Sequence, residues 1–194
     1  AAPTTRLMAR HLGEFLDQVM GLGLTTRQAE NLKRKGERRI VLQDWDGGVP
    51  GLSGSFTLGV GRDEVRVEGC DPDGLRDGVV KLVDAMALRQ APVLTQGRQV
   101  YRPRLGVRLT SVPYQGSFRD VVFLGYNAIF AGGGDLFALS RSTAIPALVE
   151  RQQGALPAPA EEARRYGLKT FAFVNTRQKF AKDHPVFVGN PDLR

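Results

Sequence analysis

Apolar residues at the start of the chain recur with the spacing of one helix face. This pattern predicts a helix with Thr4 or Thr5 as its N-cap and Gly21 near its end. Its apolar stripe consists of Leu7, Met8, Leu12, Phe15, Leu16 and Val19.

Alternation of apolar and polar residues then predicts a strand at residues 39–42 and a hairpin that turns at residues 61–64. A helix follows, with Asp71 placed to accept free backbone N–H groups and Pro72 at the first helical position. We expect this helix to pack on the hairpin, because neither element can bury its apolar face alone. Its stripe is Leu75, Val79, Leu82, Val83 and Met86.

The second half of the chain follows a different pattern, in which a strand and then a helix recur. We expect strands over 102–111, 127–131 and 168–175, and helices over 117–125 and 160–166. Near-continuous apolar strands between helices are typical of parallel strands, here adjacent in chain order. Pro92 and Pro103 bracket a polar linker, which divides the chain near Gly97 into residues 1–97, a two-layer α+β domain, and residues 98–194.

A run of three glycines, residues 132–134, ends the second of these strands and precedes Asp135. A Walker phosphate loop needs a lysine and a Ser/Thr after its glycines, and a dinucleotide fingerprint needs G-x-G-x-x-G, so a phosphate site is excluded. Two interpretations remain. Either the glycines let the backbone approach a sugar whose hydroxyls bind Asp135, or they form a turn in which Asp135 caps the next segment.

Composition excludes several other classes of protein. The only cysteine is Cys70, and His11 and His184 are far apart, so we expect no disulfide within the chain, no structural zinc and no cofactor. The apolar stretches are too short to cross a bilayer, so no membrane partner is expected. The net charge of +7 is compatible with nucleic-acid binding. Its densest part, residues 33–39, lacks interleaved aromatic residues, which favours a solvated helix end instead.

The stretch "GSFTLGVGRDEVRVEGCDPDGLRDGVVKLVDAMALR" resembles the small α+β domain that precedes the catalytic barrel in family 20 β-N-acetylhexosaminidases and in related α-glucuronidases. The region after Gly97 resembles the start of their (β/α)8 barrel. The resemblance implies that the α+β domain is followed by the first three βα units of a TIM barrel, which is incomplete within this chain, and that the protein acts on glycans.

The resemblance also implies a sugar-binding site. Arg108 matches an arginine on the first barrel strand that binds sugar hydroxyls, and Asn127 and Asp135 have the spacing of an Asn and an Asp on the second. Asn175, near the end of the third strand, is a further candidate. We expect Arg108 and Asp135 to lie close together at the C-terminal edge of the strands, where βα barrels bind their ligands. Phe130 and Gly132 stand where the family has histidines, which indicates a divergent member or a sister family.

The family's catalytic Asp-Glu pair lies on the fourth barrel strand, and no counterpart precedes Arg194. We therefore expect the N-terminal portion of a glycoside hydrolase that is not catalytic by itself. The alternative is a non-catalytic carbohydrate-binding or scaffold protein. The expected partners are a glycan and either the remainder of the barrel or a second copy of the chain, covering an apolar edge at Phe171, Phe173 or Val174. The start, Ala1-Ala2-Pro3, suits either an end left by signal-peptide cleavage or an arbitrary boundary of the sequence. The first alternative leads us to expect a secreted or periplasmic protein.

Overall fold

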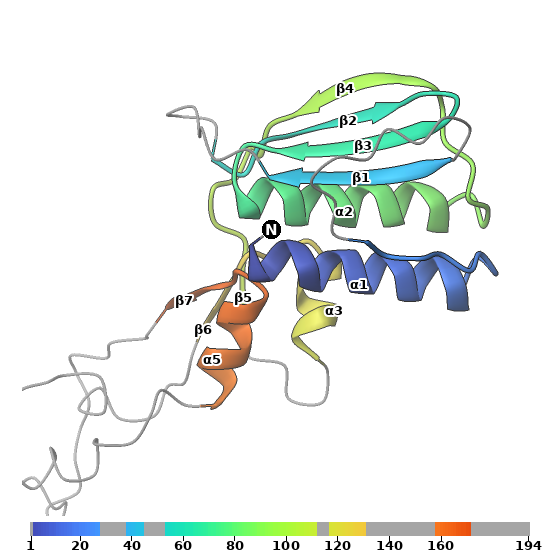
Figure 1. The fold of residues 1–194 in the computed structure, drawn as a ribbon. Coiled ribbons are helices and arrows are strands. Elements are labelled where there is room, and N and C mark those ends of the chain that lie inside the picture. The colour runs from blue at the N-terminus through green and yellow to red at the C-terminus, as the bar shows by residue number, and fades with distance from the viewer. Residues whose placement is uncertain (1, 28–37, 45–52, 112–116, 131–157, 172–194) are drawn as a thin grey trace, which may run out of the picture.

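A computed structural model describes residues 2–27, 38–44, 53–111, 117–130 and 158–171. Within these residues the chain forms a four-stranded sheet with two long helices and a three-stranded sheet with two short ones (Figure 1). The helices are α1 (Pro3–Gln18), α2 (Pro72–Ala87), α3 (Phe118–Phe123) and α5 (Ala158–Arg165). No helix in this described part is long and apolar enough to cross a membrane.

The first sheet has the order β1-β3-β2-β4. Its strands are β1 (Arg39–Asp44), β2 (Phe56–Val60), β3 (Glu64–Gly69) and β4 (Gly97–Tyr101). β2 and β3 form the predicted antiparallel hairpin, in which Leu58 lies opposite Val67. β1 runs parallel to β3, and β4 runs antiparallel to β2.

Helix α2 covers one face of this sheet, and α1 packs against α2 and β1 (Figure 1). The prediction for α2 is confirmed, because all five residues of its expected stripe are buried. The helix approaches the sheet closely at two glycines. A Cβ on Gly74 would lie 2.1 Å from the carbonyl oxygen of Ser55, and one on Gly78 would lie 2.4 Å from a methyl carbon of Val67.

The two long helices begin in different ways. Asp71 caps α2 as expected, because its carboxylate accepts a hydrogen bond of 2.7 Å from the backbone N–H of Gly74. The predicted cap of α1 is wrong. Ala2 is its N-cap, without a side-chain hydrogen bond, and Pro3 opens the helix. Proline already has the backbone φ angle of a helix, so the first turn starts at Pro3. Thr4 and Thr5 belong to this first turn, and their side chains are buried.

The sequence predicts a polar linker between Pro92 and Pro103, whereas the structure has strand β4 within that stretch. The strand is mostly exposed, yet its backbone completes the first sheet, and the ring of Tyr101 stacks on Phe56 with centroids 4.7 Å apart. The first sheet therefore reaches Tyr101, while the division of the chain near Gly97 stays a prediction. An edge strand that exposes both faces lacks the alternation by which buried strands are detected.

The second sheet contains β5 (Leu109–Ser111), β6 (Ala128–Phe130) and β7 (Lys169–Phe171). These strands are parallel and lie in chain order, as predicted. α3 follows β5, and the reciprocal hydrogen bonds of Ser117 and Asp120 form a capping box at its start. The expectation of an incomplete barrel stays a prediction, because the described residues contain only these three parallel strands.

Candidate functional site

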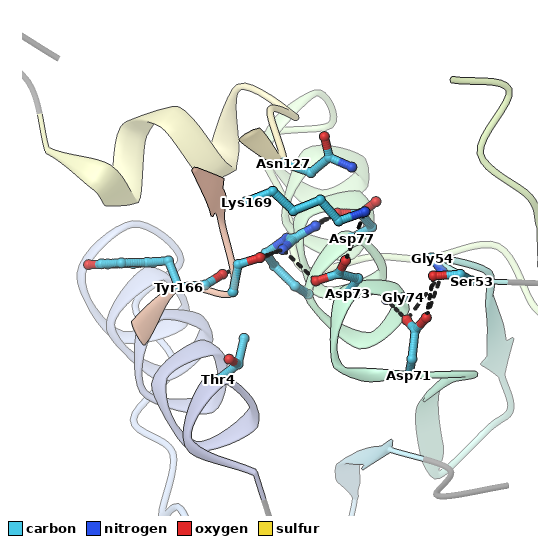
Figure 2. Close-up of polar contacts among 12 residues, drawn as sticks. Thr4, Ser53, Gly54, Asp71, Asp73, Gly74, Asp77, Asn127, Tyr166 and Lys169 are labelled. Atoms are coloured by element: carbon cyan, nitrogen blue, oxygen red, sulfur yellow. Dashed lines mark hydrogen bonds and ion pairs between the residues drawn. The ribbon is translucent and has the colours of Figure 1, made fainter. Parts of the chain in front are cut away.

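Polar contacts join the N-terminal ends of β5 and β7 to the first half of α2, and Figure 2 shows Lys169 beside the aspartates of that helix. The residues involved directly precede or open the strands: Arg108 before β5, Asn127 before β6 and Lys169 at the start of β7. On α2, Asp77 pairs with Arg108 and Asp73 pairs with Lys169, and both aspartates also pair with Arg76. Within the described residues, Asn127 is hydrogen-bonded to the segment that leads into β5 and not to α2. We call these six residues the junction cluster.

Arg76 is the centre of the junction cluster, and none of its surface is exposed. Its Nη1 donates to Asp73 Oδ1 at 3.0 Å and to the carbonyl oxygen of Gly167 at 2.9 Å. Its Nε and Nη2 donate to Asp77 Oδ1 at 3.2 and 3.1 Å. A guanidinium can be buried in this way because its donors form a planar fork that meets several acceptors at once. Arg76 thereby attaches α2 to the turn between α5 and β7.

Arg108 extends the same contact to β5. Its Nη2 donates to Asp77 Oδ2 at 2.5 Å, its Nε to the carbonyl oxygen of Gly125 at 2.6 Å, and its Nη1 to that of Leu105 at 3.1 Å. Asn127 is 5% exposed. Its Oδ1 accepts from the backbone N–H of Arg108 at 2.7 Å, and its Nδ2 donates to the carbonyl oxygen of Gly106 at 3.0 Å. The polar atoms of both side chains are thus engaged within the protein.

This placement corrects the expected position of Arg108. It lies at the N-terminal edge of the parallel strands, whereas ligands of βα barrels bind at the C-terminal edge. The geometry favours a structural role for Arg108 and Asn127, and sugar binding by them remains an untested prediction. Asp135 and Asn175, the other two candidates, lie outside the described residues.

A second polar group surrounds His11, which is buried between α1 and the end of α5. Its Nδ1 lies 2.9 Å from Glu14 Oε2, its Nε2 lies 3.2 Å from the hydroxyl of Tyr166, and the rings of His11 and Tyr166 are stacked. The hydrogen bond with His11 lowers the pKa of the Glu14 carboxyl, and Arg119, 3.6 Å away, acts in the same direction. Burial raises the pKa of Tyr166. These groups join α1 to α5 at the N-terminal side of β7.

The C-terminal edge of the strands has a different character. Phe130 and Phe171 are register partners on β6 and β7, and 38% and 39% of their surfaces are exposed. Ile129 is fully buried in the core that contains residues of α3 and α5, so Phe130 points to the opposite face of the sheet. The two phenylalanines therefore offer exposed aromatic surface on the face away from these helices. The sequence predicts Phe171 as an interface residue and gives no signal for this exposed aromatic pair.

Comparison with solved structures places this fold among glycoside hydrolases. One similar structure is an enzyme of glycoside hydrolase family 138 that targets pectin rhamnogalacturonan II, with a TM-score of 0.66 at 14% identity, over 87% of this chain and 29% of that one. A family 115 4-O-methyl-α-glucuronidase with specificity for decorated arabinogalactans aligns with a TM-score of 0.59 at 15% identity, over 98% of this chain and 31% of that one.

The Streptomyces plicatus N-acetyl-β-hexosaminidase aligns with a TM-score of 0.53 at 18% identity, over 90% of this chain and 40% of that one. No protein-family profile and no curated protein sequence matches. At these identities the similarity establishes a glycoside hydrolase-like fold. The chain spans 29–40% of the length of these three enzymes.

The described part of the chain has no group of His, Cys, Asp and Glu side chains able to hold a metal ion. The two edges of the parallel sheet differ in the side chains that they carry. The N-terminal edge carries the charged junction cluster, whose groups bind one another, and the C-terminal edge carries exposed aromatic side chains. On βα barrels, the first edge serves stability and the second binds substrate.

Proposed function

We propose that this chain is the N-terminal portion of a secreted or periplasmic glycoside hydrolase, similar to the β-N-acetylhexosaminidases, and that the glycan meets the C-terminal edge of β5, β6 and β7. The observation that carries the proposal is the polarity of this sheet. Its strands run from the junction cluster on α2 toward Phe130 and Phe171. Aromatic rings at that edge can stack on the apolar faces of sugar rings.

The chain is not catalytic by itself in this proposal. Glycoside hydrolysis uses a pair of carboxyl groups on either side of the scissile bond, or one carboxyl group with the substrate's acetamido group as nucleophile. Ser111, Phe130 and Phe171, which end the three described strands, supply no carboxyl group. In the family that the sequence resembles, the acidic pair belongs to a fourth strand.

A partner that extends the parallel sheet would supply the missing strand. β7 pairs with β6 on one side, and no described strand pairs with its other side. Unpaired backbone groups on such an edge favour the addition of a further strand. The remainder of a barrel, or a second copy of the chain, would satisfy them and would cover Phe171.

The alternative is a carbohydrate-binding or scaffold protein that needs no catalytic partner. The same observation supports it, because exposed aromatic side chains without a nearby carboxyl group on the described strand ends can bind a sugar without cleaving it. The two functions differ in whether any assembly that contains this chain hydrolyses a glycoside.

Binding calorimetry with an oligomer of β-linked N-acetylglucosamine tests the shared part of both functions. We expect Phe130→Ala/Phe171→Ala to weaken binding at least about tenfold, which corresponds to about 1.4 kcal/mol. Leu88→Ala/Leu124→Ala, at two exposed positions on other elements, is the matched control and should bind like the wild type. Equal affinity of all three proteins, or no binding to any glycan of a panel, would overturn the proposal. Hydrolysis by the isolated chain would contradict the division of labour with a partner.

A further inference from the structure

A polar groove lies along α1, on a part of the fold that the proposed function does not use. Its volume is about 480 Å³, within the range of small-ligand sites. One wall is the exposed side of α1, and the other is the segment that follows the helix and ends at Thr26. Its lining includes the charged residues Arg6, Arg10, Glu14 and Asp17 and the hydroxyl-bearing residues Thr25 and Thr26.

The basic part of the groove consists of Arg6 and Arg10, which lie one helical turn apart and therefore on the same side of α1. Arg10 is 64% exposed, and its contact with Glu14 is long, at 3.9 Å. The side chain of Arg6 has no hydrogen bond or ion pair with any residue that the structure describes. Two guanidinium groups are thus available to an anionic ligand, and each can bind a carboxylate or sulfate through two parallel hydrogen bonds.

The rest of the groove requires a ligand that also carries hydroxyl groups. Thr25 and Thr26 are exposed and present hydroxyls, while Asp17 presents a carboxylate that accepts hydrogen bonds. An acidic side chain in the groove repels a ligand that is charged along its whole length. No aromatic residue lines the groove, so nucleic-acid bases would have nothing on which to stack.

We propose that this groove binds an acidic oligosaccharide, with a carboxylate or sulfate group on Arg6 and Arg10 and sugar hydroxyls on Asp17 and the two threonines. The net charge of +7 would raise the local concentration of such an anionic ligand. The groove is a second glycan site, distinct from the C-terminal edge of the parallel sheet. The choice of a sugar polymer over other hydroxylated anions rests on the proposed function.

Titration calorimetry with a cello-oligosaccharide that carries a single glucuronate at its non-reducing end tests this proposal, with the neutral cello-oligosaccharide of the same length as comparison. We expect Arg6→Gln/Arg10→Gln to raise the Kd for the acidic oligomer at least about tenfold. Arg62→Gln/Arg98→Gln is the matched control, because it removes the same charge at two exposed positions of the first sheet. It should leave the Kd within about twofold. Circular dichroism checks that all variants keep the fold, which their exposure predicts.

An equal loss in both double variants would overturn the proposal, because it would show attraction by net charge alone. Absence of binding to the glucuronate-bearing oligosaccharide would also overturn it, as would displacement by a single-stranded oligonucleotide at equal concentration. The proposed function is judged separately, by the binding of neutral N-acetylglucosamine oligomers and its dependence on Phe130 and Phe171. Either result can therefore fail while the other holds.

Discussion

Replacing Arg76 by methionine tests whether the junction cluster holds the parallel sheet on α2. Methionine keeps much of the length of the side chain but removes every donor. The carboxylate of Asp77 therefore loses two hydrogen bonds, and the carboxylate of Asp73 and the carbonyl of Gly167 lose one each. Removing one partner of a buried ion pair typically costs about 3–5 kcal/mol.

The cost here should lie at the lower end of that range. Asp73 and Asp77 are 23% and 17% exposed, so water can reach them in the variant. Asp77 also keeps its ion pair with Arg108, and Asp73 keeps the longer one with Lys169. We therefore expect Arg76→Met to lower the free energy of unfolding by about 3 kcal/mol.

Urea denaturation followed by far-ultraviolet circular dichroism measures this change. Arg76→Lys keeps the charge but lacks the planar fork, and it should lose an intermediate amount. Arg98→Met is the control, since Arg98 is 72% exposed and its loss should cost less than about 0.5 kcal/mol. If the free energies of unfolding of Arg76→Met and the wild type differ by less than about 0.5 kcal/mol, the junction cluster does not hold the two sheets together.

Two further predictions concern α2 and α1. Gly74→Ala should destabilise the protein by about 3 kcal/mol in the same denaturation assay, because its Cβ would meet backbone. Gly13→Ala, whose Cβ would meet nothing closer than 3.7 Å, should stabilise α1 by about 0.5–1 kcal/mol, and the reverse order would contradict the packing. The hydrogen bond with His11 lowers the pKa of Glu14 in the folded state. The ionised carboxylate of Glu14 therefore stabilises the fold at pH values above its unfolded-state pKa, and this stabilisation is lost as the pH falls through its folded-state pKa. Between about pH 5 and pH 3 the wild type should lose more stability than Glu14→Gln, by less than about 1 kcal/mol, and parallel curves would refute this.

The elements with local signals were predictable from the sequence. The alternation of apolar and polar residues predicts the hairpin of β2 and β3. Asp71, Pro72 and the apolar stripe predict α2. Both signals can be detected because caps and periodicity depend on neighbours in sequence. The order of β5, β6 and β7 followed from strand–helix repetition. For the hairpin and α2 the physical cause lies within about twenty residues, whereas the order of the three parallel strands depends on the repeating pattern over a longer stretch.

The junction cluster could not be predicted in that way, since its contacts join distant parts of the chain. Arg76 is separated from Gly167 by 91 residues, and Asp77 from Arg108 by 31. One signal was present in the sequence. Arg76 lies three residues before Val79 and seven before Val83, on the buried side of α2, with aspartates at positions 73 and 77 to neutralise it. A charge on an apolar stripe requires such partners.

The central claim is that glycan meets the C-terminal edge of β5, β6 and β7, opposite the junction cluster. A titration of the ¹⁵N-labelled chain with a neutral N-acetylglucosamine oligomer, followed by ¹H–¹⁵N correlation spectra, tests it most directly. We predict that the amide signals of Ser111, Phe130 and Phe171 shift most. Shifts confined to Arg108, Asn127 and Lys169, or no shifts at all, would contradict the claim.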